Sequence, residues 1–249
     1  MSKKINFDDL DFNKFRELAL SDELSLHEKV GFPDDYRQGK EESIFADMKS
    51  KLKWLKHREK IVLEIGPGCS GLPILLADLC KENSHMLHLV DSKEMLEYLP
   101  QYKNIFKWPG CFPHIPDLFD QLEGKVDVII AYSVIQYVFV EGNLWDFIDR
   151  SLSLLADEGE ILLGDIPNYT MRKRFFASQA GICSHKAYTG RDELPDTEFN
   201  VLEPGRMDDS VVFAILARAR AQGYHAWVIP QAEELSMSNR REDILIRKP

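Results

Sequence analysis

A glycine-rich turn constrains the fold of this chain more than any other feature. The stretch VLEIGPGCSGLP, residues 62–73, carries Gly66, Gly68 and Gly71 directly after an apolar run, in G-x-G-x-x-G spacing. Glycine adopts left-handed backbone angles and lets a ligand come close to the main chain. The stretch therefore predicts a buried strand, a tight turn and a helix that begins beside a nucleotide.

Strand-like and helix-like segments alternate after this turn. Continuous apolar strands separated by helices are typical of a parallel sheet with both faces covered. The expected strands are residues 60–66, 85–91, 104–110, 126–133 and 159–166. The expected helices are residues 71–82, 92–99, 143–156 and 209–223. The chain is thus predicted to be an α/β protein.

Two further strands, residues 224–231 and 242–249, break this alternation. Only the ten residues 232–241 separate them. A parallel crossover needs roughly a dozen residues or more. We therefore expect an antiparallel hairpin at this place in the sheet.

Two segments stand outside the alternating part of the chain. Residues 1–58 are polar and acidic with helical periodicity in two places, which predicts an N-terminal helical cap before a catalytic domain at 59–249. The helix that leads into the first strand is expected to lie across the cofactor site as a lid. Residues 167–208 follow a strand end, and an irregular stretch of this length predicts a lid or substrate insertion.

Charge and composition argue against several classes of function. The chain has 31 Lys and Arg against 41 Asp and Glu, a formal net charge of −10, which disfavours a broad nucleic-acid interface. No window approaches about 18 apolar residues, and MSKKINFDDLDF has no signal-peptide core. We therefore expect no membrane association and a cytoplasmic location. The cysteines lack C-x-x-C spacing, so no metal motif is expected and the thiols should be reduced.

Two acidic residues decide which ligand suits the glycine turn. Asp91 ends the second expected strand, 20 residues after Gly71, where an acid hydrogen-bonds ribose hydroxyls. Glu64 precedes Gly66 by two residues and would repel the pyrophosphate that a dinucleotide brings to the helix N-terminus. A cationic amine suits Glu64 better. The pattern favours S-adenosylmethionine, which carries an ammonium and a sulfonium but no phosphate.

These residues resemble motif I of the class I S-adenosylmethionine-dependent methyltransferases, with the family's E/D-x-G-x-G at Glu64, Gly66 and Gly68. DVIIAYSVIQYV and GEILLGDIPN resemble the family's fourth and fifth strands, and the last helix and hairpin resemble its reversed seventh strand. The resemblance covers roughly residues 58–166 and 209–249. It implies a three-layer sandwich around a mostly parallel seven-stranded sheet in the order 3-2-1-4-5-7-6, with the last strand antiparallel. It also implies an enzyme that uses S-adenosylmethionine as cofactor.

The resemblance further implies a set of cofactor contacts. Residues just past the fourth strand line the methionine moiety in the family. After the third strand many members have an acid and an apolar residue for adenine, whereas this chain has Cys111 and Phe112. Phe112 can pack on adenine, but a thiol is a weak acceptor, so a backbone contact would have to serve. The expected cofactor contacts are Glu64, Gly66, Pro67, Gly68, Gly71, Asp91, Ser92, Cys111, Phe112, Ser133 and Gln136.

Catalytic and substrate residues are harder to identify from motifs. Methyl transfer is an in-line displacement that needs positioning more than a strong base. Candidates lie at strand ends and in the covering segments. The catalytic candidates are Tyr137, Asp165 and His185, and the substrate-binding candidates are Tyr36, Arg37, Asn168 and Arg172. Core packing explains Tyr137 equally well, and solvated surface positions explain His185 and the RKR run at 172–174 slightly better.

The leading hypothesis is a methyltransferase that acts on an oxygen of a small molecule or of a sugar- or phosphate-linked glycan precursor. Its N-terminal cap resembles those of small-molecule and sugar methyltransferases, including some from bacterial polysaccharide clusters. Two other classes stay open: an NAD(P)-dependent oxidoreductase that uses the G-x-G-x-x-G turn, and a non-catalytic binding module. The sequence does not determine the acceptor atom, the general base or the oligomeric state.

Overall fold

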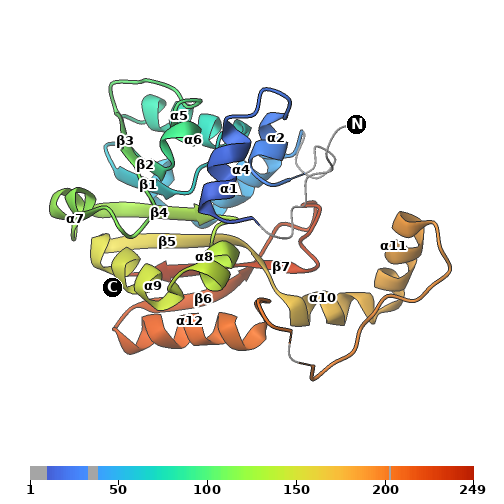
Figure 1. Ribbon diagram of the computed structural model, residues 1–249. Helices are drawn as coiled ribbons and strands as arrows, with labels where there is room; N and C mark the ends of the chain where they lie inside the picture. Colours follow the sequence, from blue (N-terminus) through green and yellow to red (C-terminus); the bar gives the residue numbers. More distant parts are fainter. Residues whose placement is uncertain (1–9, 33–38, 202) are drawn as a thin grey trace.

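A seven-stranded sheet forms the centre of the protein, with helices on both faces (Figure 1). The computed structural model describes residues 10–32, 39–201 and 203–249. The strand order is β3-β2-β1-β4-β5-β7-β6. In chain order the strands are β1 (Ile61–Ile65), β2 (Met86–Asp91), β3 (Ile105–Pro109), β4 (Val126–Tyr132), β5 (Leu155–Pro167), β6 (His225–Pro230) and β7 (Arg241–Arg247).

The strand directions confirm the predicted architecture. Strands β1 to β5 pair in parallel, whereas β7 runs antiparallel to both β5 and β6. The short connection between β6 and β7 explains the reversal, because it is too short for a parallel crossover. The expected three-layer sandwich in the order 3-2-1-4-5-7-6 is therefore confirmed.

Successive residues of the central strands enter opposite halves of the core. Ile129 packs into one apolar cluster and its neighbour Ile130 into the other, and both side chains are fully buried. Alternation of this kind is what a strand covered on both faces requires. Burial of one such side chain stabilises the fold by about 1.5–3 kcal/mol.

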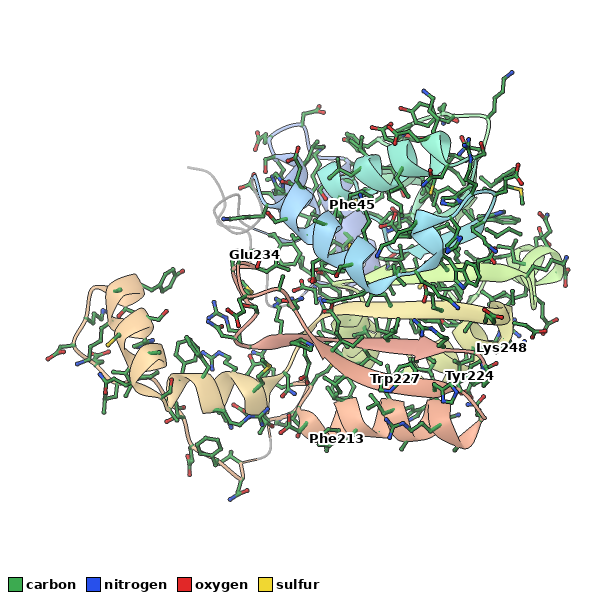
Figure 2. All side chains as sticks on the ribbon, turned by 180° about the vertical axis from the view of Figure 1, so that it is seen from behind. Phe45, Phe213, Tyr224, Trp227, Glu234 and Lys248 are labelled. Atoms are coloured by element: carbon green, nitrogen blue, oxygen red, sulfur yellow. The ribbon has the colours of Figure 1, made fainter. Side chains whose placement is uncertain are left out.

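Each face of the sheet has its own set of helices. One face is covered by α4 (Glu41–Lys51), α5 (Gly71–Glu82) and α6 (Lys93–Leu96), together with the short helix η2 (Trp54–Lys56). The other face is covered by α7 (Pro116–Leu122), α8 (Ile135–Glu141), α9 (Leu144–Leu154) and α12 (Asp209–Ala221). Phe45 on α4 and Phe213 on α12 accordingly lie on opposite sides of the sheet (Figure 2).

Two short helices near the N-terminus, α1 (Phe12–Ala19) and α2 (Leu26–Lys29), pack beside α6. Arg16 of α1 contacts Glu94 of α6 with an Nη2–Oε1 distance of 2.8 Å, and the Tyr98 hydroxyl donates to the Ala19 carbonyl at 2.8 Å. We expected the helix before β1 to cover the cofactor site. The structure instead packs that helix, α4, against α5 and the sheet, because Ile44 and Met48 are buried there.

The segment expected to be an irregular insertion contains two helices, α10 (Tyr169–Phe176) and α11 (Gln179–Thr189). Both project to one side of the sheet (Figure 1). The Asn168 side chain accepts from the Met171 amide, and the Ser178 side chain accepts from the Gly181 amide. Each helix begins at one of these capping side chains. A search for hydrophobic periodicity does not detect such a local signal. No helix in the described part of the chain is long and apolar enough to cross a membrane.

Candidate functional site

A cavity of about 440 Å³ lies at the carboxyl ends of β1, β2 and β4. Its walls come from the glycine turn, the loop after β3, helices α1 and α8, and the start of α9. The strand order reverses between β1 and β4, and open α/β sheets bind ligands at such a switch point. The volume is in the range of small-molecule sites.

The glycine turn needs its glycines for both conformation and space. Gly66 and Gly68 each have a φ of +67°, in the left-handed region. A Cβ atom on Gly66 would lie 2.7 Å from Val134 Cγ2, and one on Gly68 would lie 2.5 Å from Val30 Cγ1. Both glycines line the cavity, as does Pro67 between them. The main chain therefore borders the ligand space directly.

Glu64 is a buried carboxylate in the cavity wall. It is 2% exposed, and its Oε2 atom has no hydrogen-bond partner within the described residues. Burial raises the pKa of the Glu64 carboxyl to about 8, and the negative charge of Asp91 adds to the shift. An unpaired buried charge is costly. A cationic group beside Glu64 would favour its ionised form and provide the partner that Oε2 lacks.

Asp91 is held at the end of β2 by two backbone amides. Its Oδ2 accepts from the Gly68 amide at 2.9 Å, and its Oδ1 accepts from the Ser92 amide at 2.6 Å. Burial raises the pKa of the Asp91 carboxyl to about 6, although these hydrogen bonds oppose the shift. Each oxygen keeps acceptor capacity for a ligand hydroxyl. Ser92 does not line the cavity, since its hydroxyl accepts from the Met95 amide and caps α6.

The wall after β3 contains the residues that stand where the family has its adenine contacts. Cys111, Phe112 and Pro113 all line the cavity. The Phe112 ring packs edge-on against Phe147 of α9, with ring centroids 5.1 Å apart, within the roughly 4.5–7 Å typical of aromatic pairs. Asp146 precedes Phe147 and lines the same cavity. Sequence reasoning missed Asp146, although its place in the first turn of a predicted helix was visible.

Ser133 joins the cavity to a buried polar group behind it. Ser133 lines the cavity, and its hydroxyl donates to Asp165 Oδ2. The Arg241 guanidinium also donates to Asp165 Oδ2, at 2.8 Å. Ser133 and Asp165 have φ values of +60° and +59°, which are uncommon for residues other than glycine. Backbone strain of this kind concentrates at functional sites.

Tyr137 and Gln136 follow Ser133 but have different surroundings. The Tyr137 ring lines the cavity and packs edge-on against Phe15 of α1, with ring centroids 5.0 Å apart. Gln136 does not line the cavity; its Nε2 donates to the Ser133 carbonyl at 2.8 Å. Tyr137 is therefore placed to contact a ligand, and Gln136 to position the turn at Ser133.

Several predicted site residues lie away from this cavity. Gly71 begins α5, where a Cβ atom would lie 3.2 Å from Glu41 Cγ. Asn168 is buried and donates to Asp209 and Glu242. None of the four residues Gly71, Asn168, Arg172 and His185 lines the cavity, and Asp165 reaches only a smaller neighbouring pocket that it shares with Tyr132. Tyr36 and Arg37 lie outside the described residues.

The cavity lining is acidic and aromatic. Its carboxylates are Asp11, Glu64, Asp91, Glu141 and Asp146, and its aromatic side chains are Phe12, Phe15, Phe32, Phe112, Tyr132, Tyr137 and Phe147. Within the part of the chain that the structure describes, no lysine or arginine lines it. The α1 residues were recognised in the sequence as a helical apolar stripe, but their contact with a ligand cavity was not. The lining favours a ligand with positive charge over an anionic one.

No protein-family model matches the chain, and no curated protein matches it significantly. Solved structures do match. The N-methyltransferase NodS from Bradyrhizobium japonicum WM9, in complex with S-adenosyl-L-homocysteine, superposes with a TM-score of 0.58 at 15% identity, covering 97% of this chain and 100% of that chain. A SAM-dependent methyltransferase from Aquifex aeolicus superposes with a TM-score of 0.52 at 16% identity, covering 97% of this chain and 100% of that chain. At these identities the likeness establishes the fold, which is that of the class I methyltransferases.

Proposed function

We propose that this protein is an S-adenosylmethionine-dependent methyltransferase acting on a small molecule. Its fold is shared with enzymes of that activity, one of them solved with S-adenosyl-L-homocysteine. The observation that carries the proposal is the buried Glu64 carboxylate, which borders the cavity beside a left-handed glycine turn. A cationic nucleoside derivative matches this combination, because the carboxylate needs a positive partner and the turn admits a nucleoside.

The residues present fit S-adenosylmethionine group by group. The unpartnered Glu64 oxygen would receive the α-ammonium, and Asp91 would receive the ribose hydroxyls. Phe112 and Pro113 would border the adenine ring. The acid missing after β3 has a candidate replacement in Asp146, whose carboxylate lines the same cavity.

When bound, S-adenosylmethionine supplies a methyl group activated by a sulfonium. The chain's own residues would then align and shield the acceptor. Phe15 and Tyr137 pack together at the cavity wall and would exclude water. In the proposed step the Ser133 oxygen would take the proton that the acceptor group releases while the Ser133 hydroxyl proton passes to Asp165 Oδ2, so the proton would end on the Asp165 carboxylate. We propose Tyr137, which lines the cavity, as a catalytic residue, and Asp165, which contacts the cavity only through Ser133, as the final proton acceptor; nothing in the geometry supports such a role for His185.

The finer hypothesis concerns the acceptor. We propose an oxygen of a sugar- or phosphate-linked small molecule, of the kind used in bacterial polysaccharide biosynthesis. Support comes from the resemblance of the N-terminal cap and from arginines that lie just behind the cavity wall. The first of these is Arg241, whose guanidinium pairs with the Asp165 carboxylate.

A calorimetric titration with S-adenosylmethionine, S-adenosylhomocysteine and NADH tests the proposal. We expect both sulfur nucleosides to bind in the cavity and NADH not to compete with them there, because Glu64 and Asp91 would repel its pyrophosphate. The titrations are repeated with Glu64→Gln. Glu82→Gln, at the exposed end of α5, is the matched control for that variant. Binding of NADH alone would show that the protein is an oxidoreductase instead.

A further inference from the structure

The cavity itself is a poor place for an anionic substrate group. Five carboxylates line it, and the described part of its lining contains neither lysine nor arginine. A phosphate placed among these carboxylates would be repelled. If the proposed methyltransferase uses a phosphate-linked acceptor, the phosphate must therefore lie outside the cavity. This inference deepens the proposed function and rests on it.

Three arginines lie near two aromatic rings, those of the first and last residues of α10, Tyr169 and Phe176. We call Arg172, Arg206 and Arg240 the arginine cluster. Arg172 Cζ lies 4.9 Å from the Phe176 ring centroid and 5.7 Å from that of Tyr169. Arg206 Cζ lies 4.9 Å from the Tyr169 ring centroid, and Arg240 Cζ lies 5.7 Å from that of Phe176. Stacking on a ring orients a guanidinium while its N–H edge stays available for hydrogen bonds.

The carboxylates near the cluster are engaged by other residues. Glu203 pairs with Lys173 at 2.8 Å, and Asp209 pairs with Arg174 at 2.5 Å. Glu242 accepts from Asn168 at 2.5 Å. Consequently neither Arg172 nor Arg206 has a carboxylate partner among the residues that the structure describes. In a chain with a net charge of −10, this is a local excess of positive charge.

The cluster is connected to the cavity through residues in direct contact. Arg240 is followed by Arg241, whose guanidinium donates to Asp165 and lies 6.0 Å from the Phe32 ring centroid. Phe32 lines the cavity, and Asp165 accepts from the cavity residue Ser133. In Figure 1, α10 leaves the sheet directly after β5, next to the start of β7. Asp165 and Arg241 thus connect the cavity residue Ser133 to the segment that carries Arg240.

We propose that the arginine cluster is an oxyanion site that binds the phosphate part of the methyl acceptor. The acceptor's reactive group lies in the acidic, aromatic cavity, and its phosphate lies on the guanidinium edges of Arg172 and Arg206. Planar guanidinium groups match phosphate oxygens with paired charge-assisted hydrogen bonds. The division of charge selects acceptors that are anionic at one end only, because a second anionic group would meet the cavity carboxylates.

Calorimetric titration of inorganic pyrophosphate at low ionic strength tests the oxyanion site. The wild-type protein should bind it saturably. The double variant Arg172→Gln/Arg206→Gln should bind about tenfold more weakly or worse, as expected for losing charge-assisted hydrogen bonds. The double variant Arg172→Lys/Arg206→Lys should lie between the two, since it keeps the charge and loses the planar fork. S-adenosylmethionine affinity should be unchanged in every variant, which also reports that each is folded.

The matched control is Arg218→Gln. Arg218 also stacks on an aromatic ring, Trp145 at 5.4 Å, but it pairs with Asp149 on the face covered by α9 and α12. Its loss should leave pyrophosphate binding unchanged. No saturable binding to the wild type, or an equal loss in Arg218→Gln, would overturn the proposal. Equal binding of citrate in a parallel titration would overturn the assignment to phosphate.

Methyl transfer separates this inference from the proposed function. Labelled S-adenosylmethionine is incubated with the protein and a small-molecule cell extract, and products are separated by anion exchange before and after phosphatase treatment. We expect a retained product that phosphatase releases, at lower yield with Arg172→Gln/Arg206→Gln. A neutral labelled product would overturn the inference but would still support the proposed methyltransferase function. Pyrophosphate binding without any labelled product would support the oxyanion site and contradict the proposed function.

Discussion

At the scale of single residues, two buried carboxylates determine the chemistry of the cavity. Glu64 lacks a partner for Oε2 within the described residues, and Asp91 is held by the amides of Gly68 and Ser92. Burial raises the pKa of both carboxyls, to about 8 and about 6 respectively. Their placement destabilises the protein at neutral pH and prepares it for a ligand that carries positive charge.

Glu64→Gln should change the pH dependence of stability. The folded-state pKa of Glu64 lies at about 8, above its ordinary value of 4.5, so the folded protein loses stability relative to the unfolded chain as pH rises between them. The variant should lack this loss, so its unfolding free energy relative to wild type should rise from pH 4 to pH 8 by on the order of 4 kcal/mol. Urea unfolding of both proteins across that range measures it. Parallel pH profiles would contradict the burial of an unpaired carboxyl.

Asp91→Ala should weaken S-adenosylmethionine binding by about 1.5–3 kcal/mol, the scale of lost hydrogen bonds to a charged group. The substitution also frees the amides of Gly68 and Ser92, which Asp91 holds. Calorimetry gives the affinity, and thermal unfolding shows whether the fold survives. Unchanged affinity would mean that the ribose lies elsewhere.

At the scale of elements, the N-terminal helices and the glycine turn depend on each other. Val30, at the end of α2, lies where a side chain on Gly68 would be. Lys29 of α2 donates to the Ala19 carbonyl at 3.0 Å, and Arg16 of α1 pairs with Glu94 of α6. The Arg16–Glu94 pair contributes little, since solvent and salt screen exposed ion pairs. Packing of α2 on the turn is therefore the more important contact.

Gly68→Ala tests this coupling. The new Cβ atom meets Val30 at 2.5 Å and must adopt a φ of +67°, so we expect a loss of roughly 1–3 kcal/mol or more in unfolding free energy. Adding Val30→Ala to Gly68→Ala should restore the unfolding free energy lost to the clash. It should not restore the free energy lost to backbone strain at position 68. A double-mutant cycle by chemical denaturation separates the two. Strictly additive effects would show that α2 does not pack on the turn in solution.

At the scale of the whole molecule, the functional parts lie along one edge of the sheet. The cavity, the Ser133–Asp165 contact and the arginine cluster follow the carboxyl ends of the parallel strands from β2 to β5 and continue to the start of β7. Helix α11 lies beyond this series, and its residues do not line the cavity. The expectation that residues 167–208 form a lid or substrate insertion stays a prediction, since none of the residues that line the cavity comes from this segment.

Replacing residues 179–189 by a short Gly-Ser linker should leave S-adenosylmethionine binding unchanged. The helix contacts the rest of the protein mainly through α10, and Phe176 meets His185 with ring centroids 6.0 Å apart. The measurement is the dissociation constant by calorimetry, with the intact chain as reference. A large loss of affinity would mean that α11 closes over the cavity when the cofactor binds.

Much of the fold was predictable because buried residues recur along the sequence at the spacing of a helix or a strand. The glycine turn predicted the β1–α5 junction. Helices α10 and α11 were missed, since side-chain caps at Asn168 and Ser178 begin them and their apolar periodicity is weak. The predicted site residues that line the cavity are Glu64, Gly66, Pro67, Gly68, Asp91, Cys111, Phe112, Ser133 and Tyr137.

The strand order was an expectation from the resemblance to the class I methyltransferases. The sequence by itself determined the α/β class, the terminal hairpin and the glycine turn with its two acids. These features depend on neighbouring residues and on regular spacing, which a single chain displays directly. Only the tertiary structure decided that α1 rather than α4 borders the cavity, that Ser133 contacts Asp165, and that Arg172, Arg206 and Arg240 gather at two rings. Such contacts join residues far apart in the chain, and their distances are set by how the packed elements meet.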